Sequence, residues 1–349
     1  MNPVKVGLIG YGLSGRVFHA PFLKKLPEFQ VTQVFSSREK EVRFDFPDAS
    51  KTKLAASVDD LLKSDVDLVV ITSPNTEHYS QAKAALQLGK HVLLEKPFVA
   101  KLSEAEELMA LAEQKKKVLS VFHNRRFDGD FIWMKEALRG GRFGDWTFFE
   151  SRFDRFRPLL PAVEQRRWRD QPLSMSGVFW DLGPHLIDQA ICLLGFPKDI
   201  QLRLLFQRAG ATVDDGFILH LGYGNQSHGT SKLAVLSAGS VVAFPEFRMR
   251  LDAAKGGAQI IGMDGQEESL RTGQGQAIRQ KLRTFDGDSN QESDIPVGDY
   301  TQFYQGIAEA ILYGKDAPVT AQEAADVVQI MELAIRSHHL GQRLPVRSL

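Results

Sequence analysis

The sequence predicts a two-domain α/β protein: a doubly wound parallel sheet at the N-terminus, then an α+β domain with a large, mainly antiparallel sheet. Over roughly the first 120 residues, short apolar runs alternate with helical segments, which is typical of parallel strands joined by helices. From about residue 202 to residue 250, β-like segments follow one another across turn residues, as in an antiparallel sheet. The length of 349 residues suits two domains, which we place at residues 1–122 and 123–349.

The parallel strands are indicated by short runs rich in Val, Ile, Leu and Phe with little alternation, as expected for strands covered on both faces. Helices are expected between them. Ser103 and Glu106 have capping-box spacing. Thr76 is placed to cap a helix that runs to Leu88, and Gly89 suits the C-terminal end of that helix. The expected strands are residues 4–9, 31–35, 68–71, 91–94 and 118–122.

The C-terminal domain is expected to begin with a helix over residues 131–138 and a strand over residues 146–153. The polar, acidic stretch 284–299 indicates a solvated connection. Thr320 and Glu323 form a capping box that predicts the start of the last helix. Apolar residues at helical spacing predict the face of this helix that lies in the core: Ala324, Val328, Met331 and Ile335.

Composition and charge restrict the class of function. Lysine plus arginine and aspartate plus glutamate each number 43, whereas a general nucleic-acid or acidic-membrane binder normally carries a basic excess. The single cysteine, Cys192, excludes an internal disulfide and a CxxC metal site, and it fits a reducing compartment. No apolar run approaches the roughly 20 residues of a membrane helix, and no stretch of signal-peptide length opens the chain. We therefore expect a cytoplasmic protein with no nucleic-acid or membrane partner.

Metal ligands are also not expected. His338 and His339 are adjacent rather than on one helix face, and the sequence contains no HExxH motif or clustered carboxylate motif.

A glycine-rich loop, Gly10-Tyr11-Gly12-Leu13-Ser14-Gly15, directly follows the first strand and opens a helical segment. In a dinucleotide site, Gly10 permits the tight turn, Gly12 lets the backbone approach a pyrophosphate, and Gly15 lets the helix pack on the strand. The helix N-terminus stabilises the phosphate charge. The alternative is a tight strand-to-helix turn without a ligand. The context favours a Rossmann domain that binds NAD or NADP.

The end of the second strand bears on the choice of cofactor. An NAD site normally places Asp or Glu there, for the ribose 2′-hydroxyl. Here Ser36, Ser37 and Arg38 follow Phe35, and no carboxylate occurs before Glu39. Two hydroxyls and a guanidinium suit a 2′-phosphate. NADP is therefore favoured, NAD stays open, and the alternative reading of Arg38 is a solvated loop charge.

Several further segments carry a family resemblance: Ser73-Pro74-Asn75, His78, the run from Gly89 to Glu95-Lys96-Pro97, His123-Asn124, and Asp181-Leu182-Gly183-Pro184-His185. Together with the glycine loop, they resemble the Gfo/Idh/MocA family, named for glucose-fructose oxidoreductase and inositol dehydrogenase. The resemblance extends over nearly the whole chain. Three segments look most like the NADP-using scyllo-inositol dehydrogenase branch of the family: Arg155-Phe156-Arg157-Pro158, Arg167-Trp168-Arg169 and the run DLGPHLIDQA that starts at Asp181. One departure is Met175-Ser176-Gly177, where the family often has three glycines.

The resemblance implies an NAD(P)-dependent oxidoreductase acting on a polyol, an inositol or a sugar-like secondary alcohol or ketone. Lys96, His185 and Asp181 are the implied catalytic residues. Relatives commonly associate through the C-terminal sheet, so a homodimer or homotetramer is expected. The implied cofactor-binding residues are Gly10, Tyr11, Gly12, Leu13, Ser14, Gly15, Ser36, Ser37, Arg38, Ser73, Pro74, Asn75, His78, Glu95, Lys96 and Asn124.

The chemistry of these residues supports such roles. Lys96 follows a predicted parallel strand at the sheet edge where ligands bind, and an ammonium there can hydrogen-bond the reacting oxygen. Asp181 and His185 are four residues apart and share a helix face, and an imidazole can relay the hydroxyl proton. The structural alternatives are an N-cap role for Asp181 and a packed core histidine for His185. His123 is either a wall of the cofactor site or a packing residue.

The segment 152–169 is rich in arginine and aromatic residues, namely Arg152, Phe153, Arg155, Phe156, Arg157, Arg166, Arg167, Trp168 and Arg169. Either these arginines contact hydroxyl or phosphate groups near a cleft, or they are surface charges paired with Asp154, Glu164 and Asp170. Two other functions stay open: an NAD-dependent glycoside hydrolase, and a regulatory protein that binds NADP without turnover.

Overall fold

The protein, a computed structural model, is described over residues 2–162, 170–224, 231–275 and 279–346. It divides into two compact units, and each unit gathers separate stretches of the chain. The first unit contains Met1–Asn124, Leu270–Gln274 and Tyr300–Val328. The second contains Arg125–Ser269, Gly275–Asp299 and Gln329–Leu349.

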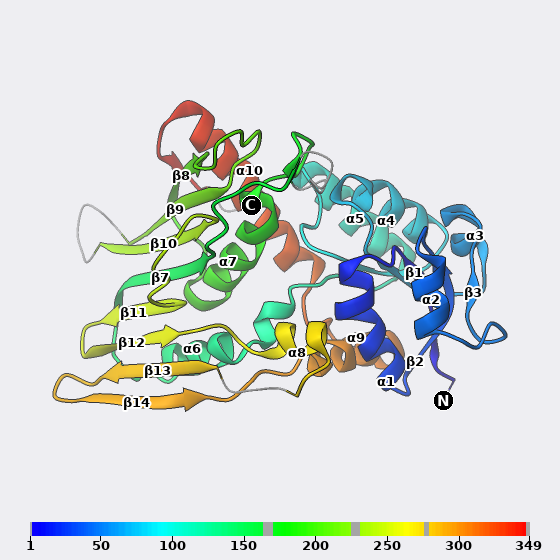
Figure 1. The fold of residues 1–349 in the computed structure, drawn as a ribbon, viewed down its shortest axis with the longest axis horizontal. Coiled ribbons are helices and arrows are strands. Elements are labelled where there is room, and N and C mark those ends of the chain that lie inside the picture. Colours follow the sequence, from blue (N-terminus) through cyan, green and yellow to red (C-terminus); the bar gives the residue numbers. More distant parts are fainter. Residues whose placement is uncertain (1, 163–169, 225–230, 276–278, 347–349) are drawn as a thin grey trace. The chain divides into compact units, whose positions relative to one another are not determined.

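The first unit is built on a six-stranded sheet with the order β3-β2-β1-β4-β5-β6, and every pair of neighbouring strands is parallel. Strands β1, β2 and β3 of this sheet are labelled in Figure 1. The doubly wound fold predicted from the sequence is confirmed. The chain leaves the middle of the sheet in opposite directions from β1 and β4, which makes their junction the switch point where open α/β sheets bind ligands. The strands are β1 (Val4–Ile9), β2 (Phe29–Phe35), β3 (Lys53–Leu54), β4 (Leu68–Ile71), β5 (His91–Leu94) and β6 (Leu119–Val121).

Helices cover both faces of this sheet because its strands are buried on both sides. Val6, Val69, Val70 and Leu93 have no exposed surface, which explains why the strands read as continuous apolar runs. The helical elements are η1 (Gly15–His19), α1 (Ala20–Lys25), α2 (Glu39–Asp45), α3 (Val58–Lys63), η2 (Asn75–Glu77), α4 (His78–Gln87), α5 (Leu102–Lys115), α9 (Thr301–Tyr313) and the first part of α10 (Ala321–Leu340).

Two predicted helix caps in the first unit are wrong. Helix α5 begins at Leu102, and the carboxylate of Glu104 accepts hydrogen bonds from the backbone N–H groups of Ala100 and Lys101 at 3.1 and 3.2 Å. The Ser103 and Glu106 pair therefore lies inside the helix. Thr76 lies within the 3-10 turn η2, which precedes α4, so it does not cap that helix.

Other predicted helix ends are confirmed. Gly89 follows the C-cap of α4 with φ +71°, a conformation that favours glycine. At the start of α10, the backbone N–H of Thr320 donates to Glu323 Oε2 at 2.8 Å, and the N–H of Glu323 donates to Thr320 Oγ1 at 3.2 Å. Both bonds of a capping box are present.

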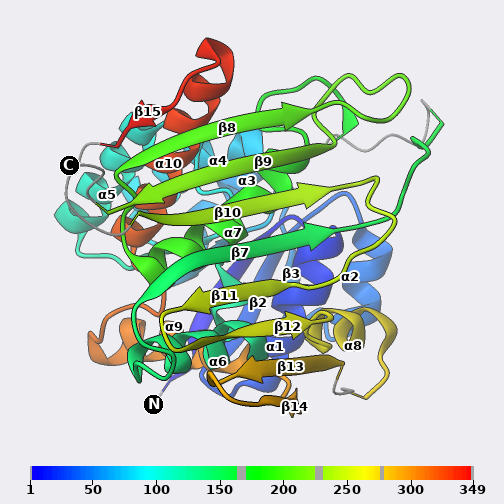
Figure 2. The same cartoon turned by 90° about the vertical axis from the view of Figure 1, so that its left-hand side faces the viewer.

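The second unit is built on a nine-stranded sheet in which β10 pairs in parallel with β7 and the other pairs are antiparallel (Figure 2). The predicted large, mainly antiparallel sheet is confirmed. Its order is β14-β13-β12-β11-β7-β10-β9-β8-β15. The strands are β7 (Trp146–Asp154), β8 (Asp199–Leu205), β9 (Gly216–Tyr223), β10 (Lys232–Gly239), β11 (Met249–Ala253), β12 (Gly256–Ile261), β13 (Gln280–Phe285), β14 (Asn290–Ile295) and β15 (Leu344–Pro345).

Helix α7 (Val178–Leu194) packs against β10, β9 and β7, and the ring of Phe179 meets that of Phe217 edge-on at 5.1 Å. The unit also contains η3 (Asn124–Phe127), α6 (Gly129–Arg139) and most of α8 (Gln266–Thr272). In the part of the chain that the structure describes, no helix has the length and apolar character needed to cross a bilayer.

The expected solvated connection over residues 284–299 is wrong, because the hairpin of β13 and β14 covers most of it. Strand β14 is an edge strand whose residues are exposed except for Ile295, so it contributes backbone hydrogen bonds and little apolar surface. A polar composition is common in an edge strand, which must resist pairing with other chains. Periodicity alone could not separate such a strand from a loop.

Candidate active site

The predicted cofactor residues of the first unit gather at one edge of its sheet. The glycine loop follows β1, Ser36 to Arg38 follow β2, Ser73 to His78 follow β4, Glu95 and Lys96 follow β5, and Asn124 comes soon after β6. All these strands are parallel, so their C-terminal ends lie at the same edge.

The glycine loop has the steric features of a phosphate-binding turn. Gly10 has φ +91°, and a Cβ atom there would lie 2.8 Å from the carbonyl oxygen of Thr72. A Cβ on Gly15 would lie 2.7 Å from the carbonyl oxygen of Gly10. A Cβ on Gly12, in contrast, would have no atom within 4 Å. The fold itself therefore requires Gly10 and Gly15, whereas the space above Gly12 is open, as the approach of a ligand to the backbone needs.

The side chains of the loop differ in their surroundings. Tyr11 is buried, and its hydroxyl donates to Asp45 Oδ2 at 2.9 Å, so this ring belongs to the packing below the loop. Burial, followed by the bond to Asp45, raises the pKa of Tyr11. Leu13 is exposed, and the hydroxyl of Ser14 donates to Glu95 Oε1. The loop is thus tied to the end of β5.

The residues after β2 leave a guanidinium accessible to solvent. Ser36 Oγ accepts a hydrogen bond from the backbone N–H of Arg38 at 3.0 Å, and Ser37 is exposed. The Arg38 side chain is 59% exposed and lies 3.5 Å from the carboxylate of Glu41. An exposed pair of this kind is weak, so Arg38 can exchange it for a phosphate.

His78 connects two of the edge loops. It is fully buried, with Nδ1 2.8 Å from the carbonyl oxygen of Pro97 and Nε2 3.2 Å from that of Ser73. Burial lowers its pKa. The hydroxyl of Ser73 donates to Gln81 at 2.8 Å, Pro74 is exposed, and Asn75 is buried. These contacts make His78 a residue that positions the loops.

Glu95 lies at the centre of a network that the sequence reasoning missed. His19 Nε2 lies 3.1 Å from Glu95 Oε1, and the backbone N–H of Lys96 donates to Glu95 Oε2 at 3.1 Å. His19 Nδ1 lies 3.1 Å from the hydroxyl of Tyr304, which donates to the carbonyl oxygen of Phe18 at 2.5 Å. His19 and Tyr304 have no exposed surface.

Both ring nitrogens of His19 lie within hydrogen-bond distance of a partner, Nδ1 of the Tyr304 hydroxyl and Nε2 of the Glu95 carboxylate. The Tyr304 proton points to the carbonyl oxygen of Phe18, because a carbonyl oxygen cannot donate. Burial acts to raise the pKa of Glu95, but the hydrogen bond and charge of His19, the charge of Lys96 and the bond from Ser14 together lower it to about 2. Glu95 is therefore ionised at neutral pH.

Lys96, His123 and Asn124 complete the predicted residues of this unit. The peptide bond between Lys96 and Pro97 is cis. Lys96 is half-buried, and it follows β5 directly, beside the Glu95 network. His123 and Asn124 are 1% and 6% exposed and follow β6. This burial is compatible with both predicted roles of His123, a wall of the cofactor site and a packing residue.

In the second unit, helix α7 carries the predicted catalytic pair. The N-cap of α7 is Gly177, with φ +93°. The carboxylate that accepts a hydrogen bond from a free N–H group of the first helical turn belongs to Asp214. Asp214 Oδ2 accepts from the N–H of Phe179 at 2.7 Å, and its carbonyl accepts from that of Val178 at 3.0 Å. A Cβ on Gly177 would lie 2.0 Å from Asp214 Oδ1. The departure Met175-Ser176-Gly177 thus keeps the glycine that this cap requires.

The N-cap interpretation of Asp181 is wrong, because Asp181 lies inside α7. Its carboxylate is 22% exposed, and its Oδ2 lies 4.0 Å from Arg155 Nη1. His185, one turn further along, is 6% exposed. Both residues lie on α7, as predicted.

The arginine-rich segment divides into two parts. Arg152 pairs with Asp154 at 2.9 Å, the partner that the surface-charge interpretation named, but the Asp154 side chain is only 4% exposed, so this is not a surface pair. Arg155 lies 4.0 Å from Asp181. Arg157 is exposed. Residues Glu164, Arg166, Arg167, Trp168 and Arg169 lie outside the described residues.

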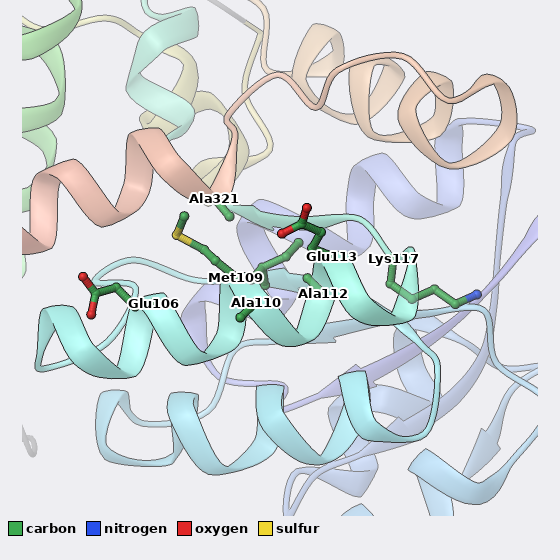
Figure 3. Close-up of a pocket in the computed structure, with 8 residues that line it drawn as sticks. Glu106, Met109, Ala110, Ala112, Glu113, Lys117 and Ala321 are labelled. Carbon is green, nitrogen blue, oxygen red and sulfur yellow. The ribbon is translucent and has the colours of Figure 1, made fainter. Parts of the chain in front are cut away.

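Two of the surface pockets formed by the described residues lie in the first unit. One, of about 410 Å³, lies along α5 and is lined by α5 side chains together with Lys117, Leu119 and Ala321 (Figure 3). It contains no predicted site residue. The other, of about 340 Å³, is lined by Tyr11, Asp45 and residues of η1 and α1. Within residues 2–162, 170–224, 231–275 and 279–346, no group of three or more His, Cys, Asp or Glu is arranged to hold a metal ion.

Comparison with known proteins gives concordant results over both units. Residues 4–123 match the oxidoreductase family with an NAD-binding Rossmann fold (GFO_IDH_MocA), and residues 135–346 match the C-terminal alpha/beta domain of the same family. The chain is 36% identical to the NADP-dependent scyllo-inositol 2-dehydrogenase IolW of Bacillus subtilis, over 97% of this chain and 94% of that protein. It is 38% identical to the uncharacterised oxidoreductase YdgJ of Escherichia coli, over 96% of each chain. The solved structure of yvaA from Bacillus subtilis has a TM-score of 0.90 with 34% identity, over 99% of each chain.

Proposed function

Because this chain belongs to the Gfo/Idh/MocA oxidoreductase family, we propose that it is an NADP-dependent dehydrogenase of polyols, inositols or sugar-like substrates. It transfers hydride reversibly between the cofactor and a carbon that bears a secondary alcohol or a ketone. In this proposal, residues 1–122 bind the cofactor and residues 123–349 bind the substrate. The observation that carries it is the position of Lys96, directly after β5 at the sheet edge that also presents the glycine loop.

Binding of a dinucleotide is supported by the open space above Gly12. The glycine loop would receive the pyrophosphate, with backbone N–H groups and the start of η1 facing its charge. Arg38, with Ser36 and Ser37, would bind the 2′-phosphate of NADP through charge-assisted hydrogen bonds. The similarity to an NADP-dependent relative supports the same cofactor.

The proposed chemistry is proton transfer at the reacting oxygen, coupled to hydride transfer that the nicotinamide supplies. Lys96 or His185 removes the hydroxyl proton when the alcohol is oxidised and returns it when the ketone is reduced. Lys96 also stabilises the charge that develops on this oxygen. The ionised Glu95, held by His19 and Ser14, accepts from the N–H of Lys96 and fixes the backbone from which the lysine side chain projects.

The proposed function is tested by binding and turnover on one preparation. NADPH and NADH are titrated by fluorescence, and a panel of inositols and sugars is then followed at the NADPH absorbance band. We expect tighter binding of NADPH and reduction of NADP by at least one polyol. Failure to bind either nucleotide would overturn the proposal. Cleavage of a glycoside without net NADPH formation would establish the hydrolase alternative, and binding without turnover of any panel member would favour the regulatory one.

The Lys96→Met variant tests the catalytic assignment. It should bind NADPH within about threefold of the unaltered protein, yet lose kcat by a factor of about 10² to 10⁴, the usual contribution of a positioned acid or base. Lys115→Met, at an exposed position of α5, is the matched control and should keep full turnover. Near-full activity of Lys96→Met would remove this lysine from the mechanism.

A further inference from the structure

The helical element that opens after the glycine loop, η1, is a π-helix that places His19 inside the first unit. The backbone N–H of Ala20 donates to the carbonyl oxygen of Gly15, five residues earlier, whereas the interval in an α-helix is four. π-Helical turns are rare in proteins and are often found at functional sites. His19 is the last residue of this turn and has no exposed surface. Its burial calls for a role other than contact with a phosphate at the loop.

Aromatic rings enclose the imidazole of His19. Its ring centre lies 4.5 Å from that of Phe122 and 6.1 Å from that of Tyr304. Both of these rings are buried, and Phe22 stacks on Tyr304 with ring centres 5.0 Å apart. The local dielectric constant in such an apolar enclosure is low, so the hydrogen bonds of the imidazole are stronger there than in water.

The two hydrogen bonds of the imidazole join segments that are far apart in the chain. Nδ1 lies 3.1 Å from the hydroxyl of Tyr304 in α9, and Nε2 lies 3.1 Å from Glu95 Oε1 at the end of β5. An ionised carboxylate only accepts hydrogen bonds, so His19 Nε2–H is the donor to Glu95. The same Oε1 accepts from Ser14 Oγ, while Oε2 accepts from the backbone N–H of Lys96 at 3.1 Å. His19 and Ser14 therefore fix one carboxylate oxygen, and the other oxygen faces the backbone of Lys96.

A comparison with His78 shows how His19 differs from a histidine that joins loops. His78 is equally buried, but its ring nitrogens lie against two backbone carbonyl oxygens, those of Pro97 and Ser73. One partner of His19, in contrast, is the ionised side chain next to Lys96.

We propose that His19 is a positioning residue for Lys96 and acts through the Glu95 carboxylate. The Nε2–H donor of His19 fixes the plane of this carboxylate, and the carboxylate fixes the backbone from which the lysine side chain reaches the reacting oxygen. The inference rests on the proposed function of Lys96. It adds to that function a residue outside both the glycine loop and the Glu95-Lys96-Pro97 motif.

Positioning of this kind affects the rate because proton transfer depends steeply on geometry. A displacement of about 1 Å at a catalytic group can lower the rate about 10²-fold. The bonds of a glutamate side chain rotate freely in solution, whereas three donors hold this carboxylate in one orientation. Loss of the His19 donor should therefore reduce turnover more than it reduces the binding of substrate or cofactor.

Two substitutions separate the two hydrogen bonds of His19. Glutamine can place an N–H donor where Nε2 lies, so His19→Gln keeps the bond to Glu95. Asparagine is one methylene shorter and reaches only the position of Nδ1, so His19→Asn keeps the contact with Tyr304 and loses that with Glu95. Initial rates of NADP reduction are measured with the inositol that the unaltered protein oxidises fastest. His19→Asn should lower kcat about 10- to 100-fold, as expected for loss of a hydrogen bond to a charged group. His19→Gln should lower it less than fivefold, and KM and the NADPH dissociation constant should stay within threefold in both.

Hydrogen exchange of the Lys96 amide, followed by NMR, is a second measurement that needs no substrate. This amide donates to Glu95 Oε2, so its exchange should accelerate at least tenfold in His19→Asn and less than threefold in His19→Gln. His91→Gln is the matched control at the opposite end of β5, where His91 Nδ1 accepts from the N–H of Val118 at 3.0 Å. It should accelerate exchange at Val118 and leave both kcat and the Lys96 amide unchanged.

Tyr304→Phe serves if His19→Asn does not fold. It removes the hydroxyl beside Nδ1 and keeps the ring that stacks on Phe22. The expected loss of kcat is about three- to tenfold, the usual effect of one neutral hydrogen bond, with faster exchange of the Lys96 amide.

The outcomes separate this inference from the proposed function. Equal losses of kcat in His19→Gln and His19→Asn, or unchanged exchange of the Lys96 amide in His19→Asn, would overturn the role of His19 and leave the dehydrogenase assignment in place. An equal loss of kcat in His91→Gln would trace the effect to stability and overturn it as well. An unaltered protein that oxidises no polyol would refute the proposed function, and exchange of the Lys96 amide would then decide alone whether His19 holds this backbone.

Discussion

Replacement of Glu95 by glutamine tests the buried network of the first unit most directly. The pKa of Glu95 falls from 4.5 to about 2 in the folded protein. One pKa unit corresponds to about 1.4 kcal/mol, so the ionised carboxylate contributes about 3 kcal/mol of folding free energy at neutral pH. Glutamine has the same shape without the charge, so it loses the electrostatic interactions of the Glu95 carboxylate with His19 and Lys96. Glu95→Gln should therefore lose about 3 kcal/mol, which lowers the unfolding midpoint by roughly 6–12 °C for a domain of 150–250 residues.

The pH dependence of this loss identifies its cause. Because the folded pKa is depressed, the stabilisation is fully present above pH 4.5 and is lost as the pH falls towards 2. Scanning calorimetry at pH 7, 5 and 3 should show the deficit of Glu95→Gln nearly unchanged between pH 7 and 5 and reduced to roughly two-fifths at pH 3. Glu107→Gln is the control, since water screens the exposed pair that Glu107 forms with Lys83. A midpoint within 2 °C of the unaltered protein at pH 7, or an equal deficit at pH 3, would refute the reasoning.

Two further predictions concern the cofactor. Gly12→Ala should leave the unfolding midpoint unchanged, because its methyl group meets no atom within 4 Å, yet lower NADPH affinity at least tenfold in a fluorescence titration. Gly10→Ala is the comparison and should instead destabilise the fold. Normal NADPH binding by Gly12→Ala would contradict the phosphate-loop assignment. Arg38→Gln should raise the dissociation constant of NADPH about 10- to 100-fold and leave that of NADH unchanged, with the exposed Lys40→Gln as control; equal losses for both nucleotides would contradict a contact with the 2′-phosphate.

Much of the first unit could be predicted from the sequence because its signals are local. Strands β1, β4 and β5 were predicted with the bounds that the structure has, since a strand buried on both faces is a continuous apolar run. The glycine loop was found because a tight turn and a close helix contact restrict the residue type at fixed spacing. The predicted cap of α5 lay two residues too far along the chain, because Ser103 with Glu106 has the same spacing as the actual pair of Lys101 and Glu104.

What only the tertiary structure decided are partnerships between residues far apart in the chain. His19, Glu95 and Tyr304 meet only in the folded unit, so no spacing in the sequence marks His19 or Tyr304 as parts of the site. Asp214, which is distant from α7 in the sequence, caps this helix, and Asp181 lies inside the helix rather than at its N-cap.

The sequence by itself determined which segments of the first unit form strands, where the glycine loop lies, and which residue types are available for proton transfer. Short-range sterics and periodic burial specify these features. The tertiary structure decided which charges are paired. Ionisation of Glu95 and the loose pairing of Arg155 with Asp181 depend on distances and burial, and Coulomb energies change several-fold between water and a protein interior.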